Sequence, residues 1–130
     1  MLNGIIPSSW QPQLHAALRI VAGLLFLEAG TSKLLHWPTS MGDGALPPML
    51  LVAGTLELVG GILITIGLFT RLTAFILAGE MAVAYFIGHM PNGFFPIVNH
   101  GEAAIMFCFI FLFLAAAGAG PYSVDDSRKS

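Results

Sequence analysis

Four long apolar stretches, each with a glutamate inside it or at its edge, constrain this chain more than any other feature. The stretches are residues 14–35, 48–69, 72–88 and 101–118, and the acids are Glu28, Glu57, Glu80 and Glu102. Each stretch approaches the roughly 20 residues that a helix needs to cross a bilayer. A carboxylate in hydrocarbon costs about 2.5–3.5 kcal/mol on insertion scales, so it normally faces a partner, a cavity or a proton. The sequence therefore predicts membrane-spanning helices with buried acids.

Composition supports the same class. Of the 130 residues, 56% are hydrophobic and only 9% are charged, whereas an average soluble domain carries about 25% charged residues. The net charge of -2 provides no basic face, so the expected partner is the lipid bilayer and not a nucleic acid. The single Cys108 excludes an internal disulfide, a CxxC redox pair and a thiolate metal cage.

The predicted fold is all-α, an integral membrane four-helix bundle. Helices are expected because lipid cannot satisfy backbone polar groups, and a bundle lets each helix bury its polar face against a neighbour. Loop-forming residues separate the stretches at 37–44, 70–71 and 90–96. We expect an N-terminal cytoplasmic segment at 1–13, the membrane domain at 14–118 and a cytoplasmic polar tail at 119–130. Residues 1–13 contain no basic residue, so the start does not resemble a signal peptide and the first span should be retained.

The basic residues predict the orientation of this multi-pass chain. An even number of spans places both termini on one side, and Arg19, Arg71, Arg128 and Lys129 would lie on that side. Only Lys33 would lie on the other side. The positive-inside rule therefore predicts that both termini are cytoplasmic.

One face of the first helix carries a regular stripe of glycines and cations. The stripe consists of Arg19, Gly23, Phe26, Gly30 and Lys33, whose spacing keeps them close to one line along a helix. We interpret it as a packing seam whose terminal cations snorkel toward the interfaces, with a binding role as the alternative. Glu28 falls on the opposite side of this helix, so a second surface such as an oligomer contact should receive it.

Glu57 and Glu80 are the candidate catalytic residues. Both fall near the middle of their predicted spans, and Glu57 shares a helix face with Gly54 and Gly61, where small residues allow another helix to approach. If both acids face the interior, they would share a proton and could handle protons during a reaction. The alternative is that each is a neutral acid that holds helices together by hydrogen bonds.

The segment before the fourth helix offers a second set of candidates. Asn99 could cap that helix, and Glu102, three residues later, could complete a capping box. Alternatively, Asn99, His100 and Glu102 could join Lys33 in binding the head group of a cofactor at a helix N-terminus. His36, His89 and His100 have no fixed ligand spacing, so no metal site is predicted.

Several of these motifs, taken in order, resemble the DoxX family of small bacterial inner-membrane proteins. They are the stripe from Arg19 to Lys33, the Glu57-Leu58-x-Gly60-Gly61 motif running to Thr70-Arg71, Asn99-x-Gly101-Glu102, and the ending Gly118-x-Gly120-Pro121-Tyr122-Ser123-x-Asp125. The resemblance implies a four-helix protein of the bacterial inner membrane. Because some relatives accompany a thiosulfate:quinone oxidoreductase or thiol-redox and oxidative-stress complexes, it also implies a redox-associated role.

The leading functional hypothesis is therefore an integral membrane subunit or accessory of a redox complex. Quinone is the candidate cofactor, and partner redox proteins or a second copy of the chain are the candidate partners. The sequence contains no flavin, haem or metal motif, so whether the chain is itself an enzyme stays open. A structural or assembly subunit without catalysis, or a small-solute transporter that oligomerises, remains an alternative.

Overall fold

Helices form all the regular secondary structure in residues 4–40 and 47–128, which are the residues that this computed structural model describes. The main helices are α1 (Gln11–Leu35), α2 (Pro48–Ile66), α3 (Thr70–Ala84) and α5 (Glu102–Ala117). Shorter helical turns are η1 (Ser8–Trp10), the π-helical η2 (Tyr85–His89), η3 (Met90–Asn92), α4 (Pro96–Asn99) and α6 (Val124–Ser127). The expected loop residues Met41 to Gly44 and the tail residue Lys129 lie outside the described residues.

The helix boundaries follow from local chemistry. Proline occupies the first turn of both α1 and α2, where its missing N–H costs no hydrogen bond. Helix α2 ends at Gly67, whose φ of 72° is left-handed and whose N–H donates to the carbonyls of Leu63 and Ile64. Glycine adopts this conformation without the steric cost of a Cβ, so the chain can turn sharply into α3.

Three helices in the described part of the chain are long and apolar enough to cross a bilayer. They are η1 continued by α1 (28 residues), α2 (19 residues), and α3 continued to Asn92 (23 residues). Helix α5 is apolar but has only 16 residues, which is about 24 Å at 1.5 Å per residue. The prediction of an all-α membrane bundle is confirmed, with a fourth helix shorter than the other three.

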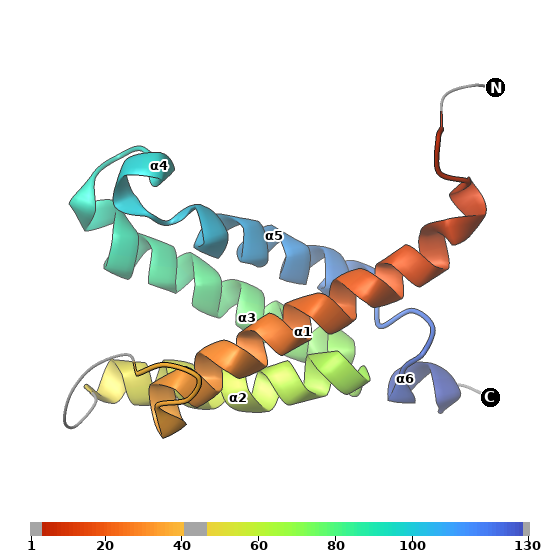
Figure 1. The fold of residues 1–130 in the computed structure, drawn as a ribbon, viewed down its shortest axis with the longest axis horizontal. Coiled ribbons are helices and arrows are strands. Elements are labelled where there is room, and N and C mark those ends of the chain that lie inside the picture. The colour runs from red at the N-terminus through yellow and green to blue at the C-terminus, as the bar shows by residue number, and fades with distance from the viewer. Residues whose placement is uncertain (1–3, 41–46, 129–130) are drawn as a thin grey trace.

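The bundle consists of two antiparallel helix pairs. The most extensive contacts join α1 to α2 and α3 to α5 (Figure 1). Phe26, Leu77 and Phe111, from α1, α3 and α5, are almost completely buried in the core between them. We call the end near Thr70 and Gly118 the termini end and the end near Leu35 and Glu102 the loop end.

Glycines form the contact between α1 and α2. A Cβ added to Gly23 would overlap Thr65, one on Gly30 would overlap the backbone of Leu58, and one on Gly61 would overlap the backbone of Leu27. The two backbones therefore touch along the stripe, and the packing seam predicted for this face of α1 is confirmed.

Neither cation of the stripe snorkels to the interface, so that expectation was wrong. Lys33 pairs with Glu57 inside the bundle. The Arg19 side chain is fully buried, and its Nε donates to the Ile64 carbonyl at 3.0 Å. The terminal guanidinium nitrogens donate to the carbonyls of Ala119, Pro121 and Tyr122. Arginine has five N–H donors, and these carbonyls replace the water that the cation would otherwise seek. Arg19 thereby ties the segment after α5 to the termini end of the bundle.

Asp125 makes a second attachment of the C-terminal segment. Its two carboxylate oxygens accept hydrogen bonds from the backbone N–H groups of Phe69 and Thr70, each at 2.9 Å, at the start of α3. Partial burial alone would raise the pKa of Asp125, but the hydrogen bonds from Thr70 and Phe69 outweigh it and hold the pKa below its usual value. The Asp125 N–H also donates to the Gly67 carbonyl at 2.8 Å.

Candidate functional site

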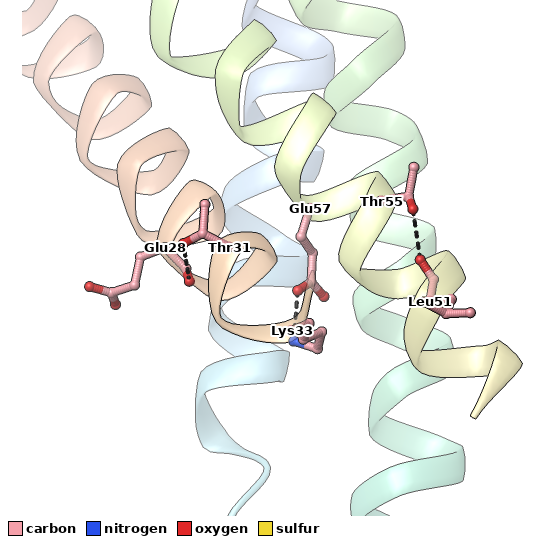
Figure 2. Close-up of polar contacts among 6 residues, drawn as sticks. All are labelled: Glu28, Thr31, Lys33, Leu51, Thr55 and Glu57. Carbon is pink, nitrogen blue, oxygen red and sulfur yellow. Dashed lines mark hydrogen bonds and ion pairs between the residues drawn. The ribbon is translucent and has the colours of Figure 1, made fainter. Parts of the chain in front are cut away.

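An ion pair between α1 and α2 forms the polar centre of the site. Nζ of Lys33 lies 2.7 Å from Oε1 of Glu57 (Figure 2), and the two side chains are only 13% and 4% exposed. The close approach of the helices at Gly30 and Leu58 brings together residues that are 24 positions apart. The pair therefore depends directly on the glycine seam.

Glu80 of α3 brings a second acid to this centre. Glu80 interacts electrostatically with Glu57 and Lys33, and it lines the same cavity as both. Both carboxyl oxygens of Glu80 are buried, and neither has a hydrogen-bond partner of standard geometry. Buried polar groups are nearly always paired, so an unpaired buried carboxyl marks a position where a ligand or a proton can be accommodated.

These three ionisable residues border a cavity of about 740 Å³. All four main helices contribute to its wall, which is largely apolar. The lining includes Phe26 and Ala29 of α1, Val52 and Leu56 of α2, Gly79 and Val83 of α3, and Ala104 and Phe107 of α5. Small-molecule sites typically have this size and this combination of apolar walls with a few polar groups.

A hydrogen-bonded cluster lies at the loop end of the cavity, where α3 continues into η2. His89, which lines the cavity, directs Nδ1 at the carbonyl of Asn99 at 3.0 Å. A carbonyl can only accept, so Nδ1 carries the proton and Nε2 is the acceptor in the neutral ring. The Asn99 side chain in turn donates to the Tyr85 hydroxyl and to the Gly93 carbonyl. The π-helical turn Tyr85–His89 positions this cluster, and such turns often occur at functional sites.

The structure brings some of the predicted site residues together and separates others. Lys33, Glu57 and Glu80 meet at the cavity. Asn99 is buried and occupied by its own hydrogen bonds, whereas His100 and Glu102 are exposed and do not line the cavity. No group of three potential metal ligands occurs in residues 4–40 and 47–128.

The predicted capping box is absent, so that interpretation was wrong. Helix α5 has Gly101 at its N-cap and no capping hydrogen bond from a side chain. Asn99 instead accepts a hydrogen bond from the Gly101 N–H at its Oδ1, because His100 adopts a left-handed conformation with φ of 61° and turns the chain before the helix begins. Asn99 therefore shapes the loop and not the helix terminus.

Glu28 lies away from this site, as the sequence predicted. Figure 2 shows its side chain pointing away from the Lys33–Glu57 pair, and the residue is exposed on the surface of α1.

The sequence did not predict that Gly79 and His89 line the cavity. Gly79 directly precedes Glu80, and this position next to a buried acid is the sequence feature from which its place at the cavity could have been predicted.

These observations define a small helical membrane protein whose interior holds an ion pair and an additional unpaired carboxyl beside an apolar cavity. The DoxX family model matches residues 14–90, and the chain belongs to this family. A protein of Haemophilus influenzae described as uncharacterized is 49% identical over 123 residues, covering 90% of this chain and 92% of that protein. No solved structure matches.

Proposed function

We propose that the protein is a membrane subunit or accessory of a redox complex, and that its cavity binds a flat, lipid-soluble molecule with hydrogen-bonding oxygens, of the quinone class. One observation carries this proposal. Both carboxyl oxygens of Glu80 are buried at the wall of an apolar cavity, and neither makes a hydrogen bond of standard geometry. A carbonyl or hydroxyl group of a quinone or quinol would pair with the oxygen that a proton shared with Glu57 leaves free.

The charge arrangement suits the chemistry of such a ligand. Reducing a quinone to a quinol consumes two electrons and two protons, so a site that serves it needs proton donors. The electrons would come from a partner protein, because the chain has no electron-carrier motif. Glu57 and Glu80 would share one proton and deliver it, a second proton from water would reprotonate the pair for the second transfer, and Lys33 would balance the charge that remains on the pair.

Ligand binding can be tested with the purified protein in nanodiscs and a decyl-tailed benzoquinone. Glu80→Leu removes the carboxyl and should weaken binding at least tenfold, whereas Glu28→Leu makes the same chemical change on the far side of α1 and should leave binding unchanged. Equal affinities in all three proteins would contradict the proposal.

Infrared difference spectroscopy tests the protons separately. A shared proton keeps one carboxyl protonated near neutral pH, so the spectrum should contain a protonated carboxyl band that shifts when the quinone binds. Glu80→Gln and Glu57→Gln should each simplify that band, and Glu28→Gln should not affect the quinone-induced shift. A spectrum without the band would rule out proton sharing.

An assembly role is the second candidate, and the position of Glu28 favours it. This acid lies inside a membrane-spanning helix and is exposed, where an unpaired charge is costly. A second copy or a partner helix would cover it. Oligomer mass in nanodiscs, compared between the wild type and Glu28→Leu, tests this role, because loss of assembly with intact quinone binding would separate the two functions.

For localisation we propose the bacterial inner membrane with both termini in the cytoplasm. Arg71 and Arg128 are exposed at the termini end, which supports this orientation through the positive-inside rule. Arg19 contributes less to the charge difference between the two sides of the membrane than the sequence suggested, because its side chain is buried. A compartment reporter fused after the last residue should report the cytoplasm, and a periplasmic signal would reverse the assignment.

A further inference from the structure

Two glycines differ from the others in the bundle. In α1 and α2, a Cβ on Gly23, Gly30, Gly54, Gly60 or Gly61 would come within about 3 Å of a neighbouring atom. At Gly79 in α3 and Gly88 in η2, an added Cβ would meet nothing within 4 Å. Glycine in a helix interior is less stable than alanine, so packing within this chain does not explain why these two positions lack a side chain.

Both glycines border the cavity that holds Glu80. The gap between α2 and α3 is closed toward the termini end, because a Cβ on Gly60 would come within 2.9 Å of the Leu77 side chain. Toward the loop end the cavity wall is open. Val52 of α2 and Val83 of α3 both line the cavity and are 60% and 55% exposed.

The acids lie at the deep end of this gap. Glu57 and Met49, both of which line the cavity, are eight residues apart on α2, which is about 12 Å along a helix. The gap therefore leads from the buried carboxyls to the surface of the bundle within one half of the membrane. In a bilayer, the surroundings of such an opening are lipid chains.

We infer that the gap between α2 and α3, kept free of side chains at Gly79, is a lateral entrance from the bilayer for a ligand with a hydrogen-bonding head and a long apolar tail. This inference rests on the proposed function of the cavity. The head reaches Glu80 and the ion pair, while the tail leaves past Gly79 between Val52 and Val83. The ligand class is thus an amphiphile of the isoprenoid-quinone type and not a tailless ring compound.

The test uses the full-length protein in nanodiscs with two probes, a decyl-tailed benzoquinone and the same ring without the tail. Gly79→Leu fills the entrance and should weaken binding of the tailed quinone at least tenfold. Ala17→Leu adds a leucine at an exposed position of α1 that does not line the cavity, and it should bind like the wild type. The tailless quinone should bind the wild type at least tenfold more weakly than the tailed one.

Thermal unfolding separates a blocked entrance from a damaged fold. Because the space at Gly79 is open, Gly79→Ala should melt at or above the wild-type temperature, and Gly79→Leu should not melt below it. A lower melting temperature for Gly79→Ala would show that the space is filled and would overturn the inference.

The remaining outcomes are also decisive. If Gly79→Leu binds the tailed quinone as tightly as the wild type does, Gly79 does not line an entrance, although the cavity still binds quinone. This conclusion holds whether or not the oligomer mass changes. Equal affinity for the two probes would refute the requirement for a tail. If neither probe binds the wild type, the proposed function itself fails.

Discussion

Nζ of Lys33 lies 2.7 Å from Oε1 of Glu57, and this ion pair joins α1 to α2 at the wall of the cavity. Both side chains are largely buried, so each charge is stabilised by its partner and not by water. Removing one partner from a buried pair typically costs about 3–5 kcal/mol because it strands the second charge.

The first prediction concerns this pair. Glu57→Leu should destabilise the protein more than Glu57→Gln, because the amide still accepts a hydrogen bond from the Lys33 ammonium. The double change Glu57→Leu with Lys33→Met should cost less than the sum of the single changes, by at least about 1 kcal/mol. Reversible unfolding in detergent measures these free energies. Strictly additive effects would show that the pair has no energetic coupling.

The second prediction concerns Arg19 and the C-terminal segment. Arg19→Met leaves the carbonyls of Ile64, Ala119, Pro121 and Tyr122 without their donors. Since a hydrogen bond to a charged group contributes about 1.5–3 kcal/mol, we expect a severe loss of stability and faster proteolysis after residue 118.

Arg128→Met is the matched control for this change. Arg128 is exposed in the same terminal segment, and its guanidinium carbon lies 5.8 Å from the centre of the Phe69 ring. Its replacement should alter the unfolding free energy by about 0.5 kcal/mol or less. If both variants lost the same unfolding free energy, the hydrogen bonds of Arg19 to the four carbonyls would contribute nothing beyond the effect of removing a positive charge.

The third prediction concerns pH. The pKa of Asp125 is lower in the folded protein than in the unfolded chain, where it is about 3.9. The stability contributed by Asp125 is therefore fully present above the unfolded pKa and is lost as the pH falls through the lower, folded pKa. Asp125→Asn should lower the melting temperature at neutral pH, and the difference from the wild type should shrink in acid below the unfolded pKa.

Asp126→Asn provides the control for Asp125, because Asp126 is a neighbouring, exposed carboxylate in the same helical turn. Its melting difference should be small and should not share the acid-dependent loss. A pH-independent difference for Asp125→Asn would indicate that the carboxylate charge does not matter at the start of α3.

The fourth prediction concerns the glycine seam. Gly30→Ala and Gly61→Ala place a Cβ against the backbone of the opposite helix, and backbone atoms cannot move aside as a flexible side chain can. Overpacking typically costs about 1–3 kcal/mol, so both variants should unfold at lower temperature and weaken the Lys33–Glu57 pair. Gly88→Ala adds the same methyl group to open space and should be tolerated. If all three variants lost a comparable amount of stability, the close backbone contact at Gly30 and Gly61 would not explain the effect.

The one-dimensional pattern was sufficient to predict the fold class and several helix faces. Apolar length specified helices in a membrane, and the spacing of Arg19, Gly23, Phe26 and Gly30 identified a buried face of α1, while Glu28 was correctly placed on the opposite face. These features depend on distances along a single helix, which the 3.6-residue repeat determines. The burial of Glu57 followed from the same reasoning.

Contacts between helices required the tertiary structure. The pairing of Lys33 with Glu57 and the approach of Glu80 depend on how α1, α2 and α3 are aligned, and no local periodicity specifies that alignment. Arg19 illustrates the limit most clearly, since its acceptors at Ala119, Pro121 and Tyr122 lie about a hundred positions further along the chain. Asn99 gained a loop role instead of a capping role because the left-handed turn at His100 was not apparent from the sequence. Helix faces are thus local properties, whereas the cavity and its charges arise only when the helices pack.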